Sequence, residues 1–179
     1  MTKYIAFLRA INVGGHTVKM DRLREIFEEM GLTNVETFIA SGNVIFKTSS
    51  KNMDALAKEI EKGLKDSLGF EVATFIRSDS ELAHIADYKP FPKFQMDSAA
   101  ALNVAFLYEP LDVKSKKLLM ELKSDIDDFH VHGREVYWLC LKKQSESKFS
   151  NAIIEKTLGV KSTLRGINTI RKMAEKYFP

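Results

Sequence analysis

Two short polar segments carry the residues best suited to chemistry in the first half of the chain. The segment 9–19 joins two adjacent glycines to the charged or titratable side chains Arg9, His16 and Lys19. The turn 40–43 has the sequence Ala-Ser-Gly-Asn. Glycines let backbone amides approach a ligand closely, and amides combined with cationic side chains bind phosphate or another anion. The pattern therefore indicates an anion site, without the spacing of a Walker or G-x-G-x-x-G motif.

Other reactive side chains lack the partners that their chemistry needs. His130 and His132 alternate onto one face of an expected strand, and the sequence supplies no evident third metal ligand. Ser41 lies outside the G-x-S-x-G pattern of a hydrolase nucleophile. The acidic run 125–128 follows an expected helix, where carboxylates commonly stay solvated, and the single cysteine, Cys140, lies in an apolar strand. The sequence therefore assigns no metal site, cofactor or catalytic residue, and leaves open whether the protein is an enzyme.

Hydrophobic periodicity predicts the elements that position the two polar segments. Apolar and branched runs predict strands, and apolar residues three and four apart predict helices. The order expected for the first half is a strand at 4–9, a helix at 20–30, strands at 34–39 and 43–48, a helix at 52–68 and a strand at 70–76. This β-α-β-β-α-β order is ferredoxin-like, and its third strand pairs antiparallel with its first. We therefore expect both polar segments at one sheet edge, with Gly15 or Gly42 at positive φ.

The same order recurs in the second half. A helix opens with Ser78 and Glu81 in capping-box spacing and leads into a connection marked by prolines, 88–98. Then come a strand at 101–108, a helix at 113–124, a hairpin of 128–132 and 135–141, and helices at 149–158 and 167–177. We expect an α+β fold of two ferredoxin-like halves, antiparallel sheets with helices packed on them. The expected division is 1–77, a linker with a helix at 78–98, and a plait-like half at 99–179 that ends in a basic helix.

Several strands are apolar on both faces, for example Tyr4-Ile5-Ala6-Phe7-Leu8 and Val136-Tyr137-Trp138-Leu139. A single ferredoxin-like sheet carries helices on only one face. The other face must then be covered either by the second half or by a second subunit, so monomer and homodimer both stay open.

Composition and charge narrow the function classes. The 179 residues are 45% hydrophobic, and we expect a folded cytoplasmic protein because no apolar run suits a membrane span or a secretory leader. Residues 142–179 carry nine Lys or Arg against three Glu, a charge of +6, within a chain of net charge +3. A basic tail suits a polyanion, a phosphorylated ligand or an acidic partner, and it also suits a solvated helix face.

Three segments closely resemble a bacterial family catalogued as domain of unknown function 1697 (DUF1697): Leu8–Gly15, Ser41–Phe46 and Glu155–Thr169. The chain departs from the family pattern at Ala10, where the family has glycine, and at Gly166 and Ile167, where it has Asn and Trp. The resemblance implies a cytoplasmic protein with duplicated ferredoxin-like halves and no established activity, cofactor or substrate. It marks as motif positions Arg9, Asn12, Gly14, Gly15, Ser41, Gly42, Asn43, Thr163, Arg165, Asn168 and Thr169.

The function expected from these observations is noncatalytic binding of a phosphate-bearing ligand or of nucleic acid, the latter through the basic C-terminal part. The expected ligand-binding residues are Arg9, Asn12, Gly14, Gly15, Ser41, Asn43, Thr163, Arg165 and Asn168. One alternative is an enzyme acting on a small anionic metabolite, with Arg9 or Arg165 stabilising charge and His16 carrying a proton. Another is a protein interaction module that uses the apolar sheet face.

The sharpest expectation is that Arg9, Asn12 and Arg165 form one polar site with the amides of the glycine segment. Arg9 ends an apolar strand, so its stem can pack while the guanidinium reaches the loop. The competing interpretation is that these groups only hydrogen-bond the loops to one another, because buried polar networks often hold loop geometry.

Overall fold

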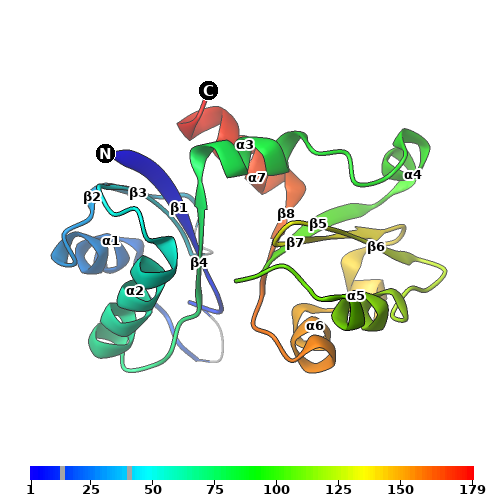
Figure 1. Cartoon of the computed structure of the whole chain (residues 1–179), viewed down its shortest axis with the longest axis horizontal. Helices are drawn as coiled ribbons and strands as arrows, with labels where there is room; N and C mark the ends of the chain where they lie inside the picture. The colour runs from blue at the N-terminus through cyan, green and yellow to red at the C-terminus, as the bar shows by residue number, and fades with distance from the viewer. Residues whose placement is uncertain (13–14, 40–41) are drawn as a thin grey trace. The chain divides into compact units, whose positions relative to one another are not determined.

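The computed structural model describes residues 1–12, 15–39 and 42–179 (Figure 1). The chain divides into two compact units, Met1–Leu82 and Ala83–Pro179. Each unit holds a four-stranded antiparallel sheet with helices, which confirms the expected α+β fold of two ferredoxin-like halves. Within the described residues, no helix is long and apolar enough to cross a membrane.

The first unit follows the β-α-β-β-α-β order, and its sheet has the strand order β2-β3-β1-β4. Its elements are β1 (Thr2–Leu8), α1 (Met20–Glu29), β2 (Thr33–Thr37), β3 (Asn43–Thr48), α2 (Met53–Leu68) and β4 (Thr74–Ser78), followed by the start of α3 (Asp79–Asp87). Helices α1 and α2 cover one face of this sheet (Figure 1). Their apolar stripes, which include Leu23 and Ile60, pack on Ala6, Leu8 and Val44 and bury the periodic residues of the sequence.

The end of β1 and the start of β3 lie side by side. Phe7 pairs with Asn43, and the backbone N–H of Leu8 donates to the carbonyl oxygen of Gly42 at 2.8 Å. Gly15 has φ +84° and Gly42 has φ +77°. The expectations that the two polar segments meet at one sheet edge and that glycine supplies a left-handed residue there are therefore confirmed.

The second unit repeats this topology with the strand order β6-β7-β5-β8. Its elements after α3 are α4 (Lys93–Ser98), β5 (Ala101–Phe106), α5 (Val113–Met120), β6 (Asp127–His132), β7 (Glu135–Cys140), the 3₁₀ turn η1 (Gln144–Glu146), α6 (Asn151–Leu158), β8 (Thr163–Gly166) and α7 (Ile167–Tyr177). Helices α5 and α6 lie on one face of the sheet (Figure 1), and Leu119 and Ile154 join Trp138 in the core there.

Besides the short η1 turn, two elements were not expected from the sequence. Strand β8 has only four residues and ends at Gly166, so it is too short to show an alternating pattern. Helix α4 lies in the connection that the prolines mark. Pro92 occupies its N-cap position, where a fixed φ of −56° suits the entry to a helix, and Lys93 forms an ion pair with Asp97 one turn later.

The central strands are buried on both faces, as their apolar composition predicts. Opposite the helices of the first unit lie Ile5, Phe7, Ile45 and Phe75, each at most 1% exposed. The corresponding positions of the second sheet, which include Val104, Phe106 and Tyr137, are fully buried. Both sheets therefore have a second apolar layer besides the one that their helices cover.

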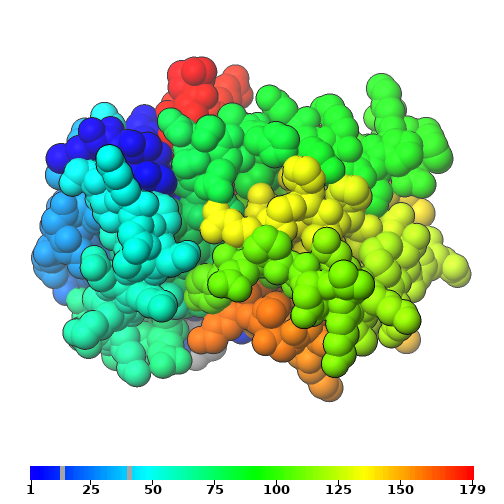
Figure 2. All heavy atoms as spheres, in the orientation of Figure 1, coloured from blue at the N-terminus to red at the C-terminus, as the bar shows by residue number. Residues whose placement is uncertain are grey.

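Beyond α3 the chain runs beside the hairpin of β6 and β7. The hydroxyl of Tyr88 lies 2.7 Å from Nε2 of His130, and the ring of Phe91 meets the edge of the same imidazole. Figure 2 shows this stretch in green next to the yellow residues of the hairpin. The connection is thus attached to the second sheet by aromatic contacts.

Candidate functional site

The amide side chains at the edge of the first sheet hold its loops. Asn12 accepts, through Oδ1, a hydrogen bond of 2.8 Å from the backbone N–H of Val18. Asn43 is buried and donates from Nδ2 to the carbonyl oxygen of Phe38 at 2.9 Å. The expected site residues Gly14 and Ser41 lie outside the described residues. The contacts of the two asparagines agree with the interpretation that this edge is a network that maintains loop shape.

The charged and titratable groups of this edge are more accessible. The side chain of Arg9 is partly buried, and its backbone N–H donates to the carbonyl oxygen of Ala73 at 2.9 Å. His16 is exposed, and its ring stacks on Phe70 with centroids 3.8 Å apart. Lys19 is exposed at the N-cap of α1 and makes no capping hydrogen bond with its side chain. Arg9 and Lys19 give this edge positive charge. In the described contacts, His16 meets an aromatic ring and no carboxylate.

The second group of expected residues lies where β8 leads into α7. Thr163 and Arg165 are buried, and Nη1 of Arg165 donates to Oγ1 of Thr163 and to the carbonyl oxygen of Leu164, both at 2.8 Å. Burial lowers the pKa of Arg165 to about 10, so the guanidinium stays charged near neutral pH. Asn168 is exposed in the first turn of α7. The structure therefore brings these three motif residues to one strand-to-helix junction.

A pocket of about 340 Å³ opens at this junction. Its polar lining comes from Asn103 of β5 and from Gly166, Asn168, Thr169 and Arg171 at the start of α7. Its apolar lining comes from Met96, 99–102 and Ile167. Gly166 occupies the N-cap of α7, and no side chain caps this helix end among the described residues. The first amides of α7 and the guanidinium of Arg171 thus border one polar hollow, where helix dipole and side-chain charge both favour an anion.

The equivalent junction of the first unit shows how such a helix start is closed. Ser78 pairs with Tyr4 in the first sheet, as Gly166 pairs with Asn103 in the second, and each is the residue just before a helix. At the start of α3 the backbone N–H of Ser78 donates to the carboxylate of Glu81 at 2.8 Å.

That capping carboxylate has no counterpart in the second unit. Counting from the paired residues, Thr169 stands where the first unit has Glu81, and Ile167 stands where it has Asp79. The start of α7 therefore lacks both acidic residues that accompany the start of α3. An anion from outside the chain can take the position that Glu81 fills in the first unit.

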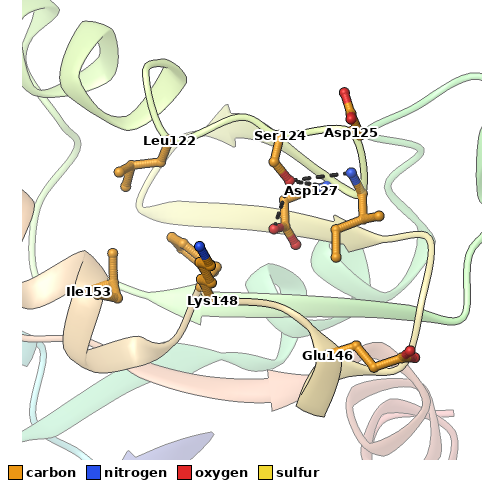
Figure 3. Close-up of a pocket in the computed structure, with 9 residues that line it drawn as sticks. Leu122, Ser124, Asp125, Asp127, Glu146, Lys148 and Ile153 are labelled. Carbon is orange, nitrogen blue, oxygen red and sulfur yellow. Dashed lines mark hydrogen bonds between the residues drawn. The ribbon is translucent and has the colours of Figure 1, made fainter.

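A larger pocket, of about 500 Å³, lies beside the start of β6 and is mostly apolar (Figure 3). Figure 3 shows that the side chains of Asp127 and Ser124, which both line this pocket, are joined by a hydrogen bond. Asp127 is 5% exposed and also accepts hydrogen bonds from Nε1 of Trp138 at 2.8 Å and from the hydroxyl of Ser147. The expectation that the acidic run stays solvated is wrong for Asp127, because three donors from its own chain compensate the buried carboxylate.

The remaining acids of this run do not assemble a cation site. Asp125 is exposed, and Asp128 forms an ion pair with Lys123 at 3.2 Å. In the part of the chain that the structure describes, no group of three or more His, Cys, Asp or Glu side chains is arranged to hold a metal ion.

Comparison with known proteins places the chain in a family. The sequence model of the family described as "Protein of unknown function (DUF1697)" matches residues 1–137. The chain belongs to the DUF1697 family. The matched part contains the edge of the first sheet and ends before the β8–α7 junction. None of the curated proteins matches the chain.

A solved structure resembles this DUF1697 protein over a longer part of the chain than the family model matches. It is that of the conserved bacterial protein SP0830 from Streptococcus pneumoniae, with 25% sequence identity and a TM-score of 0.74, and the match covers 97% of each chain. Similarity of fold therefore includes most of the C-terminal part, where α7 lies.

The site residues expected for this DUF1697 protein fall into two groups. Arg9, Asn12 and Asn43 lie in the first unit, whereas Thr163, Arg165 and Asn168 lie in the second. A shared site of Arg9, Asn12 and Arg165 stays a prediction.

Sequence reasoning did not assign Asn103 and Arg171 to a site. Asn103 is a polar residue inside the apolar run Ala101–Phe106, and that interruption was the available signal. Arg171 appears in the sequence as one of many basic residues, and only the fold places it beside Asn103 in the same pocket.

Proposed function

We propose that this DUF1697 protein binds a small phosphate-bearing molecule, without catalysing a reaction, in the pocket at the start of α7. The observation that carries the proposal is the composition of this 340 Å³ pocket, which combines an uncapped helix start with Arg171 and two amide side chains. A phosphate oxygen accepts hydrogen bonds from backbone amides, and a guanidinium binds phosphate through paired donors. Asn103, only 7% exposed, and Asn168 supply further donors for the rest of the ligand.

The lining of the pocket favours binding over catalysis. Arg171 is its one titratable side chain among the described residues, since no Asp, Glu, His, Cys, Lys or Tyr lines it. Arginine stays protonated under ordinary conditions and makes a poor proton carrier. An enzyme that uses general acid–base chemistry needs a group that gains and loses a proton near neutral pH.

The proposal is tested by calorimetric titration of the full chain with inorganic phosphate, pyrophosphate and a nucleoside monophosphate. We expect Arg171→Gln to weaken binding by about tenfold or more, because a charge-assisted hydrogen bond contributes about 1.5–3 kcal/mol. Lys172→Gln is the matched control, since Lys172 is the next residue of α7, is exposed and does not line the pocket. Equal loss in both variants would mean that bulk charge, and not the pocket, attracts the anion.

A second variant tests the comparison between the two units. Thr169→Glu places at the start of α7 the carboxylate that Glu81 supplies at the start of α3. We expect it to abolish phosphate binding and to raise the free energy of unfolding by about 0.5–1 kcal/mol, as a helix cap does. Thr169→Gln, which caps without charge, is its control. Undiminished phosphate binding by Thr169→Glu would contradict the proposed site.

A further inference from the structure

Three histidines and a tyrosine gather on the second unit, where the end of α3 meets the hairpin of β6 and β7. The Nε2 atoms of His84 and His132 are 3.1 Å apart, and both side chains are exposed. The sequence suggested a pair of His130 and His132, because they alternate on one strand. The structure instead pairs His132 with a histidine 48 residues away on a helix.

Neighbouring rings hold this pair in position. The ring of Tyr88 stacks on that of His132, with centroids 4.2 Å apart and planes inclined by 19°. The hydroxyl of Tyr88 lies 2.7 Å from Nε2 of His130, and its ring also packs on the buried Tyr137. Tyr88 is therefore anchored on both sides, and the imidazole that rests on it has a defined place before any ligand arrives.

We propose that His84 and His132 bind one divalent transition-metal ion through their Nε2 atoms. A bond from a metal to imidazole nitrogen is about 2.0–2.1 Å long, so two such nitrogens on one ion lie about 2.9–3.4 Å apart for bond angles between square-planar and tetrahedral values. The separation of 3.1 Å falls within this range. Waters complete the coordination, because the two side chains stand at the surface.

The proton balance of this step is simple. When both rings are neutral, one Nε2 carries the proton of the hydrogen bond and the other accepts it. Metal binding takes both Nε2 lone pairs, and the shared proton moves to Nδ1 of its own ring. Imidazole prefers copper, nickel and zinc ions, whereas magnesium and calcium prefer oxygen ligands, so the site selects the first group.

The test is calorimetric titration of the full chain with Cu²⁺ and with Zn²⁺. We expect about one ion per chain, tighter binding of Cu²⁺ than of Zn²⁺, and no binding of Mg²⁺. His84→Gln and His132→Gln should each weaken the affinity by about tenfold or more, because even the loss of a group that only supports a metal ligand has an effect of this size. The matched control is His16→Gln, which removes an exposed histidine from the first unit and should leave the affinity unchanged.

A spectroscopic readout separates metal coordination from effects on folding. The electron paramagnetic resonance spectrum of the Cu²⁺ complex should show two coordinated imidazole nitrogens in the wild type and one in either variant. Circular dichroism of the metal-free variants checks that both exposed substitutions leave the fold intact. A wild type that binds Cu²⁺ no more tightly than His84→Gln would show that the pair shares a hydrogen bond only, and would overturn the proposal.

Discussion

Ala10 has a backbone conformation that suits glycine better than alanine. Its φ is +54°, in the left-handed region where a Cβ is unfavourable, and it lies two residues after the end of β1, the strand that leads to the polar edge of the first sheet. The resemblance to the DUF1697 family pointed to this position, because the family has glycine there. Local backbone strain therefore lies at the start of the loop.

Replacing that alanine should therefore stabilise the protein. We expect Ala10→Gly to raise the free energy of unfolding by about 1 kcal/mol, measured by urea denaturation, because the relief of left-handed strain exceeds the added entropy of the unfolded chain. Ala99→Gly is the control. Ala99 has φ −75°, so glycine there relieves no strain and should destabilise by about 0.5–1 kcal/mol. A loss of stability in both variants would contradict the argument.

Two glycines at the same edge should respond differently to substitution. Both have positive φ, but a Cβ on Gly42 would lie 2.9 Å from Cγ2 of Ile11 and 3.0 Å from Cβ of Leu8, whereas a Cβ on Gly15 would meet nothing within 4 Å. We expect Gly15→Ala to destabilise by about 1 kcal/mol, from backbone strain alone, and Gly42→Ala by about 3 kcal/mol, from strain and overpacking together. Thermal unfolding followed by circular dichroism measures both, and equal losses would reject the packing contribution.

At the scale of elements, the buried carboxylate of Asp127 joins three parts of the second unit. It belongs to β6 and accepts hydrogen bonds from Trp138 of β7 and from Ser147, which follows η1. Asp127→Asn keeps the shape of the side chain. It replaces one accepting oxygen with an N–H donor that then faces the donors of Ser124, Trp138 and Ser147. We expect it to lower the free energy of unfolding by about 2–3 kcal/mol. Asp125→Asn, two residues earlier and exposed, should change it by less than about 0.5 kcal/mol, and similar values for the two would refute the network.

The elements that the sequence predicted well are those whose signal is local. Helix α2 carries a long apolar stripe, an Asn52 side chain that accepts from the N–H of Ala55, and Gly69 in left-handed conformation at its end, so its bounds were expected almost to the residue. The capping box of Ser78 and Glu81 was likewise confirmed. Strand β8 escaped prediction because a strand of four residues is defined by its pairing with β5, which periodicity cannot reveal.

In the whole molecule, the duplication of one topology explains why the sequence predicted the edge of the first sheet but not the pocket at the start of α7. The edge of the first sheet was expected, because antiparallel pairing of β1 with β3 follows from the ferredoxin-like order. The pocket at α7 needed the second sheet, since Asn103 and Arg171 are far apart in sequence and meet only through the pairing of β5 with β8. Comparing the two copies then shows that Glu81 closes the start of α3, whereas Thr169 stands at the equivalent position of α7.

Basic side chains on the outward face of α7 offer a polyanion a surface that is separate from the pocket. Helix α7 buries Ile167, Ile170, Met173 and Tyr177, so its outward face presents basic residues. Lys172 and Lys176 of this face are exposed, as is Lys161 just before β8, while Arg171 is partly buried. We expect the wild type to be retained on heparin and released steeply by salt, since each neutralised phosphate or sulfate adds about 0.7–0.9 to the slope of log affinity against log salt concentration.

The decisive variant replaces Lys161, Arg171, Lys172 and Lys176 with Gln. We expect its slope, measured with a single-stranded oligonucleotide, to be shallower than that of the wild type by up to about 3, because up to four ion-releasing contacts are lost. Thr169→Glu should keep most of the wild-type slope, because it closes the pocket and leaves these four side chains in place. If the quadruple variant binds the oligonucleotide as the wild type does at low salt, the +6 charge of residues 142–179 serves only a solvated helix face.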